Sequence, residues 1–273
     1  MKFHFKRARH QRTPKTVAVV LAGGFRSMSF CMPKLVSYFS GEHDVRFFLS
    51  TWDSNRIARG AKNISNIFVP IENLPERITR EYLLGSDYPL TSFWIGNQDL
   101  VSNRHRIIAD EAYQSIPESQ KRYAHEHATD PSNLVNTMNQ FYLLKKGWEL
   151  VQEYEIQKKK QFDVIVRARP DIIFKREIVW PLPGEIVSDS LRLSRTRKHG
   201  LFDGYFAGWR DDIVPVLEGY QAYLDQLAKE EFFREYISEV TIKWPFGYTS
   251  HKRVAGSKGR HSIVHTEYFY RYL

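Results

Sequence analysis

Short apolar runs followed by polar, helix-like stretches alternate through the first part of the chain. Residues 16–24 (TVAVVLAGG) are apolar without alternation and end in two glycines, which predicts a strand buried on both faces that enters a tight turn. A helix is expected to begin after Arg26 and Ser27, and residues 45–49 and 67–70 are expected to form further strands. This strand–helix–strand order predicts an α/β fold with a mostly parallel, doubly wound sheet.

Helical spacing becomes clear in the second part of the chain. Apolar residues from Leu134 to Val151 recur about every 3.6 residues, which predicts a long helix with Ser132 or Asn133 as its N-cap. Further helices are expected over residues 103–113, 213–227 and 229–239.

The segment 162–174 (FDVIVRARPDIIF) combines a buried strand with three charges. Arg167 and Arg169 lie two residues apart, so an extended chain directs both side chains to the same side. Pro170 ends the strand, and Asp171 follows at the carboxyl edge, where open α/β sheets bind their ligands. Two cations and an anion are costly at the end of a buried strand unless they are paired. A phosphate-bearing ligand would pair with them, and so would a structural Arg–Asp contact that closes the strand.

Composition sets limits on this picture. With 273 residues, 42% hydrophobic and 14% aromatic, the chain can build one large domain with a sizeable core. The single cysteine, Cys31, excludes an intramolecular disulfide and fits a reducing compartment. No apolar stretch approaches the roughly 20 residues that a membrane helix needs. We therefore expect a cytoplasmic protein with a basic, flexible arm over 1–15, one domain over 16–240 and an extension over 241–273 packed on that domain.

The formal net charge of +9 gathers in three basic segments. The arm over 1–15 is rich in Lys and Arg, and two further clusters lie over residues 192–198 and 252–260. Because no recognition helix, zinc finger or RNA-binding strand motif is found, we expect no nucleic-acid partner. The arm leaves open a peripheral contact with an anionic membrane, and the other two clusters fit a site that binds phosphate groups.

Several separated segments together resemble a known family. They are Gly24-Phe25-Arg26-Ser27, Thr51-Trp52-Asp53, the strand around Arg167–Asp171 with the helix before it, Asp203-Gly204-Tyr205-Phe206-Ala207-Gly208, and the Glu-Phe-Phe of 231–233. In order and spacing they resemble GT-A-fold glycosyltransferases of bacterial and viral surface-polysaccharide pathways, over most of residues 16–240. The resemblance implies a Rossmann-like three-layer sandwich around a mostly parallel sheet. It also implies transfer of a sugar from a nucleotide-sugar donor to a glycan or glycolipid acceptor.

The resemblance also assigns residues to the donor. Gly23, Gly24, Arg26, Ser27 and Asp53 correspond to positions that hold the base and ribose in this fold. Asp171 corresponds to the last carboxylate of the fold's Asp-x-Asp motif, which normally binds Mg²⁺ or Mn²⁺ on the diphosphate.

Arg169 stands where the first carboxylate of that motif is expected. Charge builds on the leaving diphosphate during transfer, and Arg167 and Arg169 can stabilise it because arginine forks match phosphate oxygens. We therefore expect the metal to be dispensable or only weakly bound at Asp171, so that transfer persists in EDTA.

An inverting reaction needs a general base for the acceptor hydroxyl. Asp203, Glu230 and Glu231 are the candidates; Asp203 lies in a glycine-flanked loop. The two glutamates lie near an expected helix start, where a carboxylate also has a structural use against the helix dipole.

Two alternatives remain open. Leu21–Gly24 followed by Pro33-Lys34 is similar to the start of sugar nucleotidyltransferases, although the third glycine of their loop is missing and the spacing to the lysine is shorter. A carbohydrate- or polyanion-binding protein without turnover is the other alternative, because the chain is rich in Trp and Tyr and lacks the first carboxylate. The pair His125 and His127 is too isolated to predict a metal site.

Overall fold

The computed structural model describes residues 16–25, 28–39, 41, 43–54, 75–115, 131–174, 180–184, 186–188, 205–227 and 266–268. The helices in this part of the chain are α1 (Met28–Phe39), α2 (Arg80–Leu84), α3 (Gln98–Gln114), α5 (Pro131–Lys158), α6 (Arg210–Leu217) and α7 (Gly219–Leu227). The strands are β1 (Thr16–Ala22), β2 (Asp44–Trp52), β3 (Leu90–Gly96), β4 (Val164–Ala168), β5 (Ile172–Phe174), β6 (Ile186–Ser188), β7 (Tyr205–Trp209) and β8 (Thr266–Tyr268). Within these ranges no helix has both the length and the apolar character required to cross a membrane.

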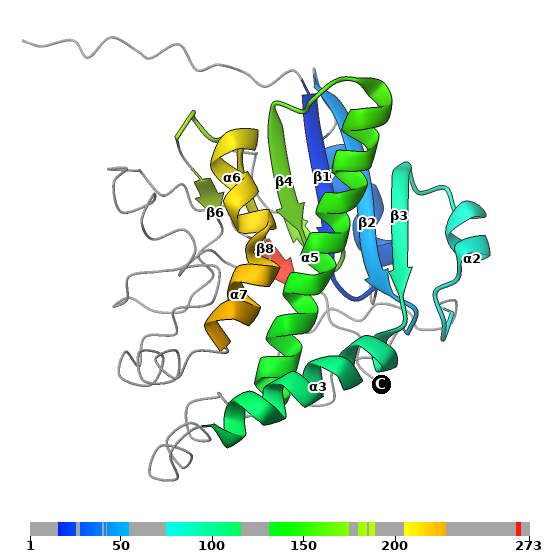
Figure 1. Cartoon of the computed structure of the whole chain (residues 1–273). Coiled ribbons are helices and arrows are strands. Elements are labelled where there is room, and N and C mark those ends of the chain that lie inside the picture. Colours follow the sequence, from blue (N-terminus) through cyan, green and yellow to red (C-terminus); the bar gives the residue numbers. More distant parts are fainter. Residues whose placement is uncertain are drawn as a thin grey trace, which may run out of the picture.

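Six strands form one sheet in the order β3-β2-β1-β4-β7-β6 (Figure 1). β1 pairs in parallel with β2 and with β4, and β2 pairs in parallel with β3. β7 runs antiparallel to both β4 and β6. The prediction of an α/β fold with a mostly parallel sheet is confirmed. β5 and β8 pair antiparallel in a separate two-stranded sheet.

Helices cover both faces of the sheet because β1 and β4 are apolar on both faces. Ala18, Val20 and Ile165 belong to the cluster under α5, while Val19 and Val166 belong to the cluster that includes α1. Every residue of β1 and of β4 is buried, as the unbroken apolar run of residues 16–22 predicts. The core therefore consists of two layers, one on each side of the sheet.

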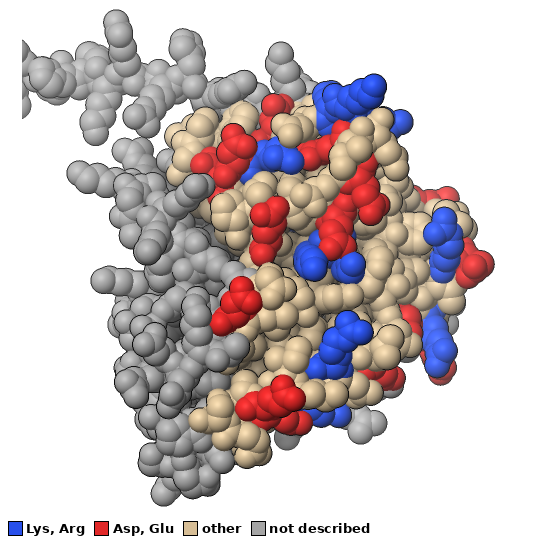
Figure 2. All heavy atoms as spheres, in the orientation of Figure 1, with Lys and Arg blue, Asp and Glu red and all other residues tan. Residues whose placement is uncertain are grey.

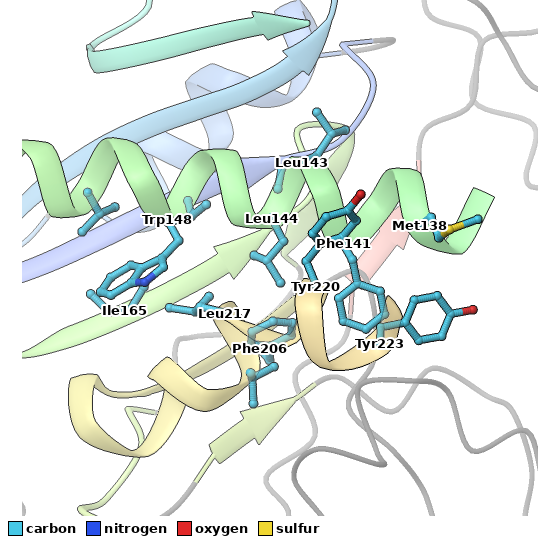
Figure 3. Close-up of a cluster of buried hydrophobic side chains, with 14 of the residues drawn as sticks. Met138, Phe141, Leu143, Leu144, Trp148, Ile165, Phe206, Leu217, Tyr220 and Tyr223 are labelled. Atoms are coloured by element: carbon cyan, nitrogen blue, oxygen red, sulfur yellow. The ribbon is translucent and has the colours of Figure 1, made fainter. Parts of the chain in front are cut away.

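The long helix α5 crosses the strands and continues past their carboxyl ends (Figure 1). It packs against strands β1, β2 and β3 and helices α3, α6 and α7, and its apolar side chains share a cluster with those of β4 and β7 (Figure 3). The side chains drawn in that figure include Met138, Phe141, Leu144 and Trp148 of α5 with Ile165, Phe206, Leu217, Tyr220 and Tyr223. These residues follow the helical spacing read from the sequence, and the predicted helix is confirmed. It begins at Pro131, so Ser132 and Asn133 lie in its first turn and the prediction that one of them is the N-cap is wrong.

Gly147 allows α5 to approach the sheet very closely. A Cβ atom at this position would lie 2.4 Å from Cγ1 of Val20 and 3.0 Å from Oγ of Ser50. The hydroxyl of Ser50, at 0% exposure, donates a 2.7 Å hydrogen bond to the carbonyl oxygen of Leu143 on the same helix. Because Gly147 has no Cβ atom, the backbone of α5 can pack directly against β1 and β2.

One prediction about helices is corrected, and some strands were not predicted from the sequence, among them β3. The expected helix over 213–227 is two helices, because α6 ends at Leu217 and α7 begins at Gly219. The apolar residues keep their helical spacing across Glu218, so this spacing alone did not reveal that α6 and α7 are separate helices. In the segment 162–174, β4 ends at Ala168, before Pro170 as expected, and Ile172–Phe174 form a separate strand, β5, that pairs in the other sheet.

The expected helix over 103–113 is confirmed as part of α3. The strand expected over 67–70, the helix expected over 229–239 and the arm over 1–15 lie outside the described residues.

Candidate functional site

The strand order creates a topological switch point between β1 and β4. The chain moves from β1 through β2 to β3 on one side, and then β4 adds to the other side of β1. In open α/β sheets, ligands bind in the crevice outside the carboxyl ends of the two strands at such a point. Leu21 lies beside Ala168 in the β1–β4 register, so the turn after β1 and the segment after β4 leave the sheet side by side.

These two segments are in van der Waals contact. A Cβ atom on Gly23 would lie 3.0 Å from Cδ of Pro170 and 3.9 Å from Cγ of Arg169. The amide of Gly23 donates a 3.2 Å hydrogen bond to the carbonyl oxygen of Ser50, so the turn is also fixed to β2. Glycine is required here by the closeness of Pro170. The structure thus brings together Gly23, Arg169 and Pro170, which are far apart in the sequence.

Arg169 and Asp171 form a bidentate ion pair. Nε of Arg169 donates to Oδ1 of Asp171 and Nη2 donates to Oδ2, each at 2.8 Å. The side chain of Asp171 is 1% exposed and that of Arg169 is 14% exposed. The Arg–Asp contact that the sequence left open is therefore present. It gives the guanidinium a fixed orientation at the switch point, with only a small exposed part.

Arg167 has different surroundings from Arg169. Its side chain is 2% exposed, and Nη2 donates a 3.3 Å hydrogen bond to the carbonyl oxygen of Ala22 at the end of β1. The guanidinium carbon lies 5.9 Å from the centre of the Phe206 ring on β7. β4 ends between the two arginines, so the extended geometry that would direct both to one side does not continue through Arg169. Arg167 thus fixes the end of β1 from within the core.

The described residues do not fit a magnesium or manganese site at Asp171. Both carboxylate oxygens accept hydrogen bonds from Arg169, whereas these cations require several oxygen ligands with room for water. No group of three or more His, Cys, Asp or Glu side chains in the described part of the chain could hold a metal ion.

Asp53 joins the end of β2 to the start of α3. Its Oδ1 accepts a 3.1 Å hydrogen bond from the amide of Gln98, and its Oδ2 accepts a 3.2 Å bond from Nδ2 of Asn97. A carboxylate at a helix N-terminus is favourable because it satisfies amides that lack a partner within the helix. The structure gives Asp53 this local role, and its expected contact with the ribose stays a prediction. No pattern in the sequence predicted that Asn97 and Gln98 lie beside Asp53.

A buried polar group lies where α3, α5 and α7 meet beyond the carboxyl edge. Nδ1 of His105 lies 2.7 Å from Oδ1 of Asn139, and Nε2 lies 2.7 Å from the hydroxyl oxygen of Tyr220. Burial lowers the pKa of His105 below its usual value, and the charge of Arg104 adds to this effect; the hydrogen bond to Asn139 acts in the opposite direction. The imidazole is therefore neutral, with Nδ1 donating to Asn139 and Nε2 accepting from Tyr220.

Aromatic side chains join this polar group to the sheet. Tyr142 stacks on Trp52 at the end of β2, with ring centres 6.3 Å apart and planes at 2°. The ring of Trp94 meets that of Tyr142 edge-on at 5.8 Å. Sequence reasoning did not identify this cluster, although Trp52 at the end of a strand and the helical spacing of Asn139 and Tyr142 were available signals.

Five of the predicted site residues lie outside the described part of the chain: Arg26, Ser27, Asp203, Glu230 and Glu231. The general base therefore stays a prediction. Gly24 is partly exposed in the turn after β1. Pro33 and Lys34, which carried the similarity to nucleotidyltransferases, occupy exposed positions on α1, with Nζ of Lys34 4.3 Å from the centre of the Phe30 ring.

Comparison of the sequence with protein-family models and with curated proteins finds no match.

Proposed function

We propose that this protein is a glycosyltransferase that moves a sugar from a nucleotide-sugar donor to a glycan or glycolipid acceptor. One observation carries the proposal. The two segments that the resemblance assigns to the donor, the Gly23 turn and the Arg169–Asp171 segment, are in contact at the switch point of a mostly parallel sheet. The finer proposal of a GT-A fold rests on the same agreement of order and position.

In this proposal Arg169 binds the diphosphate, because its guanidinium lies at the switch point and its side chain is 14% exposed. Asp171 holds the guanidinium in place, so that little side-chain entropy is lost when phosphate oxygens bind. Negative charge develops on the leaving diphosphate in the transition state, and a cation that is already oriented stabilises that charge. Arg167 supports the turn after β1 through the carbonyl of Ala22.

The first test is a thermal-shift panel of UDP-, GDP-, CMP- and dTDP-sugars, with EDTA present and then with Mn²⁺ added. We expect one donor to raise the melting temperature in both conditions, because a ligand that binds only the folded state stabilises it. The Arg169→Lys variant keeps the charge but loses the planar fork, and is expected to weaken donor binding about tenfold or more.

The matched control is Arg106→Gln, which changes an exposed arginine on α3. It is expected to leave the donor shift unchanged. A shift that appears only with Mn²⁺ would contradict the metal-independent site while leaving the glycosyltransferase proposal intact. Absence of a shift with every donor would contradict the proposed function.

The Arg169–Asp171 pair is also compatible with a second candidate, a carbohydrate- or polyanion-binding protein without turnover, because a paired arginine stabilises the charge on a leaving diphosphate less than an unpaired one would. Slow hydrolysis of the bound nucleotide sugar on prolonged incubation would support the enzyme, and binding without any hydrolysis or transfer would support the second candidate. Release of pyrophosphate from a nucleoside triphosphate and a sugar phosphate would instead indicate a nucleotidyltransferase.

A further inference from the structure

Helix α3 lies beside α5 and has one buried side and one exposed side (Figure 1). His105 and Ala109 are buried on the side that faces α5. On the other side, Leu100 is 66% exposed and Ile107 is 62% exposed. These two residues are seven apart, so they lie on the same side of the helix. Two exposed apolar side chains need no partner by themselves, so the charges around them decide what this side of α3 fits.

Four exposed charges surround Ile107 in a regular order. Arg104 and Arg106 precede it, and Asp110 and Glu111 follow it. Arg104 and Glu111 are seven residues apart and lie along one edge of the exposed side. Arg106 and Asp110 are four residues apart and lie along the other edge. None of the four forms an ion pair within the described part of the chain. Figure 2 shows basic and acidic side chains together on this part of the surface.

The order of these charges is complementary to itself in the antiparallel direction. When two copies of α3 pack antiparallel about a two-fold axis just after Ile107, the basic half of each helix faces the acidic half of the other. Arg104 then faces Glu111 of the second copy at the same height along the axis. Arg106 and Asp110 differ in height by only about 1.5 Å. Two-fold symmetry forms each contact twice, around a central contact between the two copies of Ile107. The outer face of α3 is defined by these residues: Leu100, Arg104, Arg106, Ile107, Asp110 and Glu111.

Other partners fit the outer face of α3 less well. In a parallel pair of helices, arginines would face arginines and carboxylates would face carboxylates, which is destabilising. Nucleic acid or an anionic membrane would meet Asp110 and Glu111 as well as the arginines. An unrelated protein would need the same charge order that a second copy of the chain already provides.

We propose that the outer face of α3 pairs antiparallel with the same face of a second copy, so that the protein forms a two-fold symmetric dimer. Exposed ion pairs add little affinity but fix the orientation, and one helix pair is smaller than a standard protein interface. The dimer is therefore reversible, and its amount rises with protein concentration. This inference does not depend on the proposed function, because no residue of this face belongs to the candidate site.

Sedimentation equilibrium of the full chain over a concentration series measures the association. Ile107→Glu is expected to weaken it about tenfold or more, because two carboxylates then meet at the centre of the interface. The matched control is Ile156→Glu, which makes the same exchange at a residue of α5 that is 76% exposed. The control is expected to associate like the unchanged protein. A monomer at every concentration, or equal losses in the two variants, would overturn the proposal.

Charge reversal tests the orientation of the two helices. The variant Arg104→Glu, Arg106→Glu makes the outer face of α3 acidic, and the variant Asp110→Lys, Glu111→Lys makes it basic. Each variant alone is expected to remain monomeric, whereas a mixture of the two is expected to form a mixed dimer. All four substitutions together restore the antiparallel order and are expected to restore self-association. If the mixture or the combined variant stays monomeric while the unchanged protein dimerises, the interface lies elsewhere and the proposal is overturned.

Disulfide cross-linking gives a second measurement of the register. The chain's one cysteine, Cys31, is buried, so Ile107→Cys supplies an exposed thiol next to the two-fold axis. Mild oxidation is expected to link two copies through this position. In the control Leu100→Cys, the two thiols lie at opposite ends of the interface, more than about 20 Å apart and far beyond the ~7 Å between Cα atoms that a disulfide spans. Equal cross-linking at both positions, or none at Ile107, would overturn the proposal.

Discussion

At the scale of single residues, the contact between Arg169 and Asp171 sets the geometry of the segment after β4. The carboxylate of Asp171 is 1% exposed and accepts two hydrogen bonds from the guanidinium of Arg169, so it fixes the orientation of that guanidinium. From the sequence, an ion pair between these two residues, two positions apart, was the alternative to a phosphate-binding role. The sequence could not decide between the alternatives, because the conformation of this segment depends on a tertiary contact, the packing of Pro170 against Gly23.

Replacement of Asp171 by Asn tests the structural part of that role. The variant leaves Arg169 without its anionic partner at a largely buried position, and breaking such a pair costs about 3 kcal/mol of unfolding free energy. Urea unfolding followed by circular dichroism measures the loss. Asp110→Asn, at an exposed position on α3, is the control and is expected to change stability by less than about 0.5 kcal/mol. An equally small change at Asp171 would mean that the ion pair contributes little.

His105 provides a second prediction at this scale. Its folded-state pKa lies below its usual value of 6.5, mainly because of burial, so the unfolded chain takes up a proton at a higher pH than the folded protein does. The unfolding free energy is therefore expected to fall as the pH drops below about 6.5 towards the lower folded pKa, and to be unaffected by this group above that range.

The measurement compares the unchanged protein with His105→Gln by urea unfolding at pH 7.5, 6.5 and 5.5. Glutamine keeps polar atoms near Asn139 and Tyr220 but does not titrate. The stability advantage of the unchanged protein is expected to shrink as the pH is lowered. A difference between the two proteins that is the same at all three pH values would contradict the linkage.

At the scale of elements, the accuracy of the sequence prediction depends on how each helix or strand is buried. β1 and α5 were predicted because each has a long apolar pattern that is typical of one structure. β3 was missed because it is an edge strand whose first six residues are only partly buried, so it has neither an unbroken apolar run nor a clear alternation. α6 and α7 were predicted as one helix because the apolar residues keep the same helical spacing on both sides of Glu218, the residue between the two helices.

Gly147→Ala tests the contact between α5 and the sheet. Alanine is the better helix former, but its methyl group would lie 2.4 Å from Val20. We expect a net loss of about 2 kcal/mol of unfolding free energy, since inserted methyl groups in a tight core force neighbouring atoms apart. Gly41→Ala is the matched control because a Cβ there meets nothing within 4 Å. A stability equal to that of the control would show that the helix can move away from the sheet at no cost.

At the scale of the whole molecule, charge is distributed unevenly. The described residues carry more Asp and Glu than Lys and Arg, although the chain as a whole has a formal net charge of +9. The basic excess therefore belongs to segments outside the described part, including residues 1–15. The sequence located these segments, and the structure shows that Thr16, the first described residue, lies at the edge of the sheet where α5 ends in lysines.

The length of α5 has a mechanical consequence. Its 28 residues extend about 42 Å at ~1.5 Å each, roughly twice the length of β1, so one helix reaches from the amino edge to the helices that surround His105. Gly147 lets the middle of α5 lie directly on β1 and β2, so a tilt that brought the helix closer to the sheet would force its backbone into Val20. We therefore expect α5 to keep its position on the sheet if the turns at the carboxyl edge change shape.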